Sequence, residues 1–265
     1  MGHTRLGLMP KTRKWRAVIE LMARESSDGS LMADDVHDIA RKALEAAQAG
    51  LENAKKDPGL KYTFYLLTQI VLAARRDNWV ECLGNIGINL PRNASGFDLA
   101  CETQLAIDNF ISHEGMRSDI AEIAQKSIGQ ALSELTIRGT ASLFEPSSAD
   151  LQMALREHST KTGFSDLSQK FFGNFVAHFL NFYLSRVTAG SLDTQRLKQL
   201  GDLNEFNRAL QLHCEQSARI IRDFSGDWYS KTEYQEGINQ ANTTRFIAVA
   251  IKKIKSELEK QKEGS

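Results

Sequence analysis

The spacing of hydrophobic residues along this chain is that of amphipathic helices. Apolar side chains recur three and four positions apart through most of the sequence, which places them on one face of a helix. A stripe near the C-terminus, with spacings of four, three and four, consists of Ile247, Ile251, Ile254 and Leu258. Proline removes a backbone donor and clashes with the preceding helical turn, and it occurs only four times, the last at Pro146. The pattern predicts an all-α protein of about ten helices.

The predicted helices differ in how much apolar surface they carry. The residues from Leu60 to Ala74 are apolar nearly all round, which predicts a central buried helix. Ser225–Asn239 contains Gly226 and Gly237 and is predicted to be a loop rich in aromatic residues. The other predicted helices lie near residues 12–22, 36–54, 79–83, 96–113, 118–135, 165–188, 203–224 and 240–260.

Residues 138–148 are the best candidate for a boundary within the chain, because Gly139 and Pro146 interrupt the helical pattern there. Ser147 and Asp150 follow with the spacing of a capping box, which predicts a new helix start. The expected organisation is an extended basic arm over 1–14, an N-terminal helical lobe over 15–140 and a C-terminal helical lobe over 145–265. The lobes are either closely packed or parts of one large domain.

Charge and cysteine content narrow the class of protein. The chain has 33 basic and 33 acidic residues, so it lacks the excess of Lys and Arg expected of a dedicated nucleic-acid binder. Cys82, Cys101 and Cys214 are isolated and odd in number, which argues against a disulfide framework and fits a reducing compartment. No stretch is apolar for long enough to predict a signal peptide or a membrane span. We therefore expect a cytoplasmic protein that does not bind membranes.

One helix carries an enzyme-like pattern, in which Arg208 precedes His213 by five positions. The pattern resembles the signature of HEPN ribonucleases, which are all-helical and have an Arg, then four to six intervening residues, and then a His. Ala209 departs from that signature, because those enzymes usually carry a polar residue directly after the Arg. The resemblance implies a metal-independent ribonuclease that uses Arg208 and His213. The alternative is that His213, on the apolar face with Leu210, is a core histidine.

The sequence predicts neither a metal nor a cofactor. Metal sites on helices need two ligands four residues apart, and neither His113-Glu114 nor Glu157-His158 has a second histidine at that spacing. Both pairs are expected at helix ends. The glycine-rich motifs that bind nucleotides and dinucleotides are absent from the sequence.

Two segments have the character of partner-binding surfaces. The first is the basic arm with the start of the following helix, where five cations precede the first acid: Arg5, Lys11, Arg13, Lys14 and Arg16. They could contact nucleic-acid phosphates or an acidic protein groove. The second is the predicted aromatic loop with Trp228, Tyr229 and Tyr234, since exposed Trp and Tyr often anchor interfaces.

The function expected from the sequence is that of a non-enzymatic helical adaptor or structural subunit in a multiprotein assembly. A prokaryotic defence system is one setting for such an assembly, although no residue points to it. The alternatives are the HEPN-like ribonuclease and a nucleic-acid-binding accessory protein that uses the basic arm. Other protein subunits are the expected partners.

Overall fold

The computed structural model describes residues 11–23, 33–115, 117–139, 147–191 and 200–260, and this part of the chain contains eleven helices and no strand. The prediction of an all-α fold is confirmed. The helices are α1 (Arg13–Ala23), α2 (Ala33–Ala54), α3 (Pro58–Ala73), α4 (Trp79–Gly84), α5 (Gly96–His113), α6 (Asp119–Gly139), α7 (Ser148–Glu157), α8 (Lys161–Ser191), α9 (Leu200–Ser217), α10 (Arg219–Gln235) and α11 (Gln240–Lys260).

Local capping explains why several helices begin where the sequence predicts. At α3, the Asp57 side chain accepts a hydrogen bond from the backbone N–H of Leu60 (2.9 Å), and Pro58 occupies the first turn, where its missing N–H costs nothing. The predicted capping box of Ser147 and Asp150 is present at α7. Ser95 and Asp98 form a second capping box at α5.

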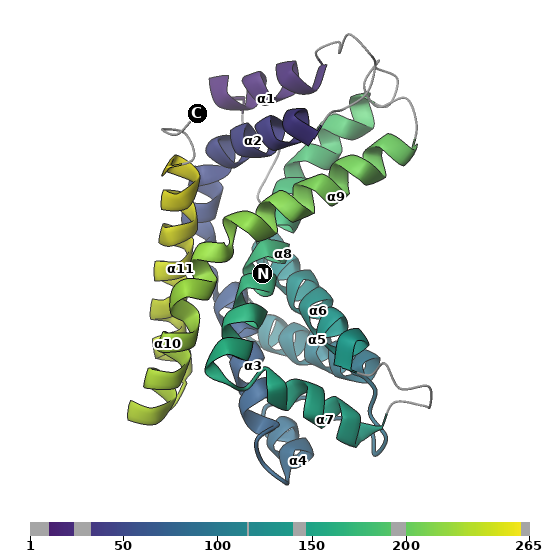
Figure 1. Cartoon of the computed structure of the whole chain (residues 1–265), viewed down its shortest axis with the longest axis vertical. Helices are drawn as coiled ribbons and strands as arrows, with labels where there is room; N and C mark the ends of the chain where they lie inside the picture. The colour runs from purple at the N-terminus through teal and green to yellow at the C-terminus, as the bar shows by residue number, and fades with distance from the viewer. Residues whose placement is uncertain (1–10, 24–32, 116, 140–146, 192–199, 261–265) are drawn as a thin grey trace.

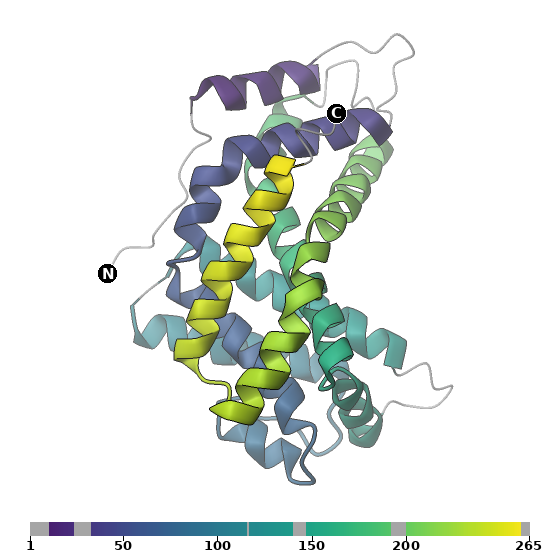
Figure 2. The ribbon, with the colours of Figure 1, turned by 60° about the vertical axis from the view of Figure 1, so that its left-hand side comes forward.

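The longest helix, α8, runs through the middle of the molecule and packs against α6, α9 and α10 (Figure 1). Helices α3 to α7 gather at the lower end of the view, whereas α1 and α2 lie across the upper end. Helices α10 and α11 lie side by side in an antiparallel pair, which Figure 2 brings to the front. They pack on the body of the molecule through α8 and through α2 and α3, respectively.

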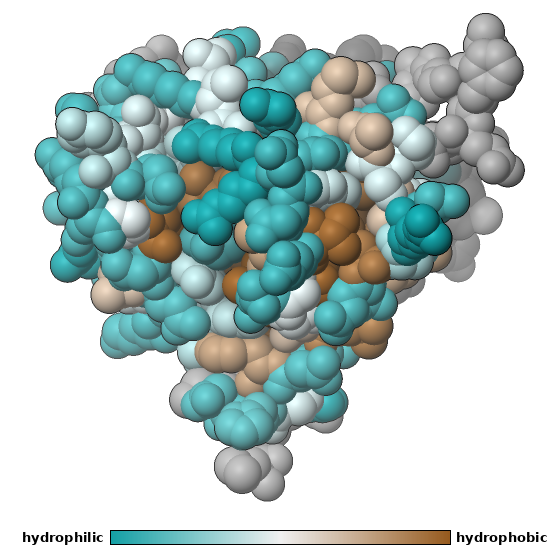
Figure 3. Space-filling view, turned by 90° about the horizontal axis from the view of Figure 1, so that it is seen from below, coloured by the Kyte–Doolittle hydropathy of each residue, from teal (hydrophilic) through white to brown (hydrophobic). Residues whose placement is uncertain are grey.

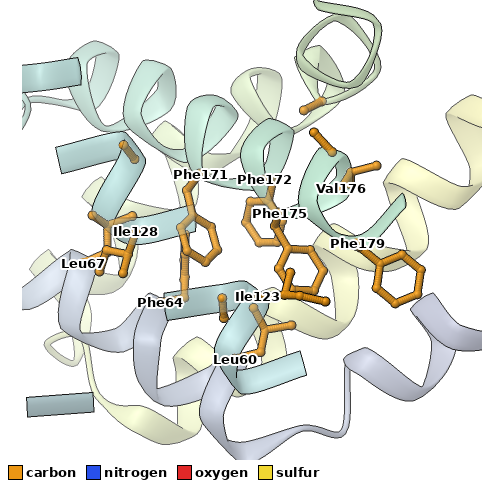
Figure 4. Packing of buried hydrophobic residues seen from close by; sticks show 14 of the residues in the cluster. Leu60, Phe64, Leu67, Ile123, Ile128, Phe171, Phe172, Phe175, Val176 and Phe179 are labelled. Atoms are coloured by element: carbon orange, nitrogen blue, oxygen red, sulfur yellow. The ribbon is translucent and has the colours of Figure 1, made fainter. Parts of the chain in front are cut away.

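The centre of the core is an aromatic cluster built on Phe64 of α3, a helix that is buried on most sides as predicted. The Phe64 ring lies 5.3 Å from that of Phe171 and 5.2 Å from that of Phe172, both on α8. Figure 4 shows these rings between the two helices. On its other side Phe64 stacks on Phe246 of α11 at 5.1 Å. Three helices that are distant in sequence therefore meet at one side chain.

Helices from both predicted lobes contribute to one continuous core. Helix α6 lies before the predicted boundary and packs along α8, which lies after it. Residues 140–146 of the boundary lie outside the described residues. The division into two lobes stays a prediction, and the packing favours its closely packed form.

The prediction of a loop over Ser225–Asn239 is wrong, because α10 continues through Gly226 to Gln235. The predicted helix over 203–224 is instead two helices, which meet at Ala218. Gly226 lies inside α10, at a place where the helix packs closely against the start of α8. A Cβ on Gly226 would lie 2.5 Å from the carbonyl oxygen of Lys161 and would also meet the hydroxyl of Ser165. The chain turns later, at Gly237, which has a φ of 72°.

This contact predicts the effect of Gly226→Ala. The added methyl group must displace the backbone of α8, so we expect a loss of about 1–3 kcal/mol in the free energy of unfolding despite the better helix propensity of alanine. The matched control is Gly84→Ala in α4, where the nearest atom to a new Cβ is 3.8 Å away. That variant should unfold at the same urea concentration as the parent protein or slightly higher. Equal losses in the two variants would contradict the close approach.

Candidate binding surfaces

The three aromatic residues predicted as partner anchors lie on one helix and differ sharply in exposure. Tyr234 is 91 % exposed, Trp228 is half-buried and Tyr229 is fully buried. The prediction of Tyr229 as a partner contact is therefore corrected. On a helix, consecutive side chains point about 100° apart, so Trp228 and Tyr229 cannot share an environment as they could in a loop.

Tyr229 is a core residue that joins α10 to α8 and to the segment that follows α3. Its ring stacks on Phe164 at 4.0 Å, and the Arg75 guanidinium lies over it at 5.3 Å. The hydroxyl is buried and has no hydrogen-bond partner among the described residues. Burial raises the pKa of this hydroxyl well above its usual range.

Trp228 forms part of an open groove of about 260 Å³ between α10 and α11. Its ring lies 4.2 Å from that of Phe246, and the half-buried Phe224 lies 5.4 Å from Phe246 on the same side. Val249, one turn further along α11, is 46 % exposed. The groove thus has an aromatic floor and an apolar edge that water reaches.

Cations of α11 border this groove. The Lys253 ammonium lies 5.5 Å from the centre of the Phe224 ring, and Lys252, the preceding residue of α11, is exposed. Arg245 forms an exposed ion pair with Glu236 across the far end of the groove at 3.6 Å. Exposed ion pairs of this kind contribute little to the free energy of unfolding. Arg245 can therefore leave Glu236 and pair with a carboxylate of a ligand at a small cost in free energy. The groove combines an apolar floor with positive charge along the α11 side.

The sequence pointed to Trp228 but missed the other groove residues. Phe224, Trp228 and Thr232 follow one another at intervals of four on α10, and Asn242, Phe246 and Val249 have helical spacing on α11. Each stripe is visible in the sequence. Their meeting depends on the antiparallel pairing of α10 with α11, which the sequence pattern alone does not specify.

The basic residues predicted as a second surface are described from Lys11 onward, whereas Arg5 lies outside the described residues. Helix α1 is fixed to the body by Trp15, whose ring lies 5.0 Å from that of Tyr183. The cations on its outer side are all exposed: Lys11, Arg13, Lys14 and Arg16. None of these cations makes an ion pair with a residue in the described part of the chain.

Arg208 and His213, the two residues of the HEPN-like pattern, lie on different sides of α9. Five residues rotate the helix by about 140° beyond a full turn. Arg208 is exposed and His213 is only 5 % exposed. The structure does not bring the two side chains together on one surface, so it gives the ribonuclease hypothesis no support.

Three further histidines, His113, His158 and His178, lie at helix ends or between helices. His113 ends α5 and His158 caps the end of α7, as expected, and the Nδ1 of His158 lies 3.1 Å from the carbonyl oxygen of Gly163. His178 contacts the Gln130 amide oxygen at 3.0 Å, and burial together with the charge of Lys126 lowers its pKa.

The described residues contain no cluster of His, Cys, Asp and Glu able to hold a metal ion. None of the described helices combines the length and apolar character needed to cross a bilayer.

The contrast between Trp228 and Tyr229 gives a prediction. Tyr229→Phe removes an unpaired buried hydroxyl, so the variant should be as stable as the parent or more stable by up to about 1 kcal/mol. Tyr229→Ala should cost about 3–5 kcal/mol, because it opens a cavity in the core. Urea unfolding followed by circular dichroism measures both. A Tyr229→Phe variant destabilised as much as Tyr229→Ala would show that the hydroxyl has a partner.

Comparisons with known proteins do not identify a role for these surfaces. No protein-family model matches the chain, and searches of curated proteins and of solved structures find no match. The function is therefore inferred from the burial, charge and contacts of the described residues.

Proposed function

We propose that the protein is a cytoplasmic, non-enzymatic helical adaptor, and that the groove between α10 and α11 binds an amphipathic, acidic helix of a partner protein. The observation that carries this proposal is the aromatic floor of the groove. Phe224 and Trp228 are half-buried and Val249 is exposed, so their apolar surface is open to a ligand while their backbone is fixed by the core.

The shape of the groove favours a helix as its occupant. The groove follows two antiparallel helices, and a helix that lies in such a channel contacts it at every third or fourth residue. Trp228 and Phe224 are one turn apart on α10, so they present two rings to successive turns of a bound helix. Binding would remove both from water without displacing any core residue.

The charges at the groove favour an acidic partner. Lys252 and Lys253 lie on the exposed side of α11, and Arg245 is held only by an exposed ion pair. A partner helix with Glu or Asp beside its apolar stripe would place carboxylates near these cations. Such complementarity speeds association and excludes basic partners more than it adds affinity.

A synthetic peptide tests this proposal. The probe is a helix-forming peptide with leucine at every third and fourth position and glutamate at the outer positions, labelled for fluorescence anisotropy. Trp228→Ala should weaken its binding by about 2 kcal/mol, or roughly thirtyfold in Kd, because the ring is the largest group in the groove. Tyr234→Ala is the matched control, since Tyr234 is exposed on another side of α10. This variant should leave the Kd of the peptide unchanged.

Two outcomes would contradict the proposal. The first is failure of the parent protein to bind the acidic peptide. The second is equal binding of a peptide with lysine in place of every glutamate, because the positive side of the groove should reject it. Lys252→Glu combined with Lys253→Glu should reverse the preference between the two peptides.

A second candidate function is nucleic-acid binding through α1, which the exposed cations there favour, since none of them has an ion-pair partner in the described part of the chain. If this surface contacts phosphates, replacing both Arg13 and Lys14 by Gln should weaken binding to a labelled DNA duplex. The slope of the logarithm of the binding constant against the logarithm of the salt concentration should become shallower by about two. The control replaces Lys252 and Lys253 by Gln. Absence of binding by the parent protein at low salt, or the same loss in the control, would exclude this use of α1.

A further inference from the structure

A second cavity lies at the end of the molecule opposite α1, where the end of α3, helix α4 and the turn between α10 and α11 meet. Its volume of about 410 Å³ falls within the range of small-molecule sites. Figure 3 views this end of the molecule, where hydrophobic residues show between hydrophilic ones. None of the sequence motifs points to this cavity.

The polar side of the cavity is cationic. Arg75 and Arg76 line it, and neither has a carboxylate within 4 Å among the described residues. Arg75 is engaged by the protein, because its Nη2 donates to the carbonyl oxygen of Ser159 and its guanidinium lies over Tyr229. Among the described residues, the Arg76 guanidinium has one hydrogen-bond contact, with the Sγ of Cys82 at 3.8 Å, which is a weak acceptor. Arg76 therefore keeps most of its donors available.

The neighbouring helix end does not account for Arg76. Cations after a helix often satisfy its last carbonyl groups. Here the side-chain amide of Gln152 donates to the carbonyl oxygens of Ala74 (3.1 Å) and Arg76 (3.0 Å). Because α7 supplies this cap, the Arg76 side chain is left for another role.

The wall formed by the turn between α10 and α11 is fixed in place. The Glu233 carboxylate accepts a hydrogen bond from the backbone N–H of Ile238 at 3.2 Å, and Gln69 donates to the Ile238 carbonyl oxygen at 3.2 Å. Among the described residues that line the cavity, Glu233 is the one acid, and its carboxylate is already engaged by the backbone. Two arginines against one glutamate leave the lining with a net positive charge.

Apolar side chains complete the lining of the cavity. Leu72 of α3, Ile86 after α4 and Ile238 after α10 all line it. A guanidinium prefers planar or tetrahedral oxyanions, which it can bind with two parallel hydrogen bonds. We infer that this cavity binds a small organic anion, with its carboxylate or phosphate head on Arg76 and its apolar body against Leu72, Ile86 and Ile238.

Displacement of a fluorescent probe tests this inference. The probe is anilinonaphthalene sulfonate, an amphipathic anion whose emission rises in apolar sites, and the competitors are octanoate, octyl phosphate and octanol. Octanoate and octyl phosphate should displace it from the parent protein, whereas neutral octanol should not. The stronger of the two anions identifies the preferred head group.

Variants locate the binding. Arg76→Gln should weaken octanoate binding about tenfold, since it removes a charge-assisted contact while keeping the size of the side chain. Ile86→Trp should block probe and competitor alike by filling the cavity. Arg92→Gln, a change of an exposed arginine outside the lining, and Trp228→Ala in the groove should leave displacement unchanged. Equal affinity in Arg76→Gln and the parent, with unchanged melting of both proteins, would overturn the inference, as would displacement by octanol.

Discussion

The packing of Phe64 against rings from three other helices holds this structure together. Phe64 contacts Phe171 and Phe172 of α8, Phe246 of α11 and Trp228 of α10, the last at 6.4 Å. An aromatic pair contributes beyond its buried area when its rings are offset or tilted, and here one ring takes part in several such pairs. Because α3 is buried on most sides, a shift of Phe64 would disturb its contacts with α8 and with the pair α10 and α11 at the same time.

Both candidate sites depend on that arrangement. The groove lies on the outer side of Trp228 and Phe246, whose inner sides face Phe64. The arginines of the cavity come directly after α3, and the opposing wall comes from the turn that joins α10 to α11. The core therefore sets the width of the groove and the distance across the cavity. Two surfaces that open in different places are positioned by the same contacts.

The helices could be predicted where their signals are local. The bounds of α5 and α11 agree with the sequence, and Asp57 with Pro58 and Ser147 with Asp150 mark helix starts through side chains only a few residues from the amides they cap. The loop predicted around Trp228 failed because Gly226 is required by the approach of α8, a contact with residues some sixty positions earlier in the chain. A glycine that permits close packing and one that ends a helix look alike in a sequence.

The candidate sites were predictable only in part, for the same reason. Trp228 and the α1 cations can be picked out from the sequence by their residue types. The groove forms only where α10 packs beside α11, and the sequence does not show that these two helices pair. Arg75 and Arg76 look like ordinary basic residues after a helix. The availability of Arg76 to a ligand follows from Gln152, which is distant in sequence and caps the helix end instead.

The central claim is that Phe64 couples the α10 and α11 surface to the rest of the fold, and one unfolding measurement tests it. Replacing Trp15 and Trp79 by Phe leaves Trp228 as the one tryptophan of the chain, so fluorescence reports α10 while circular dichroism reports all helices. In this background Phe64→Ala should lower the free energy of unfolding by about 3–5 kcal/mol, with both signals changing in one coincident urea transition. A Trp228 transition that separates from the loss of helix, or that keeps its midpoint in the Phe64→Ala variant, would contradict the account.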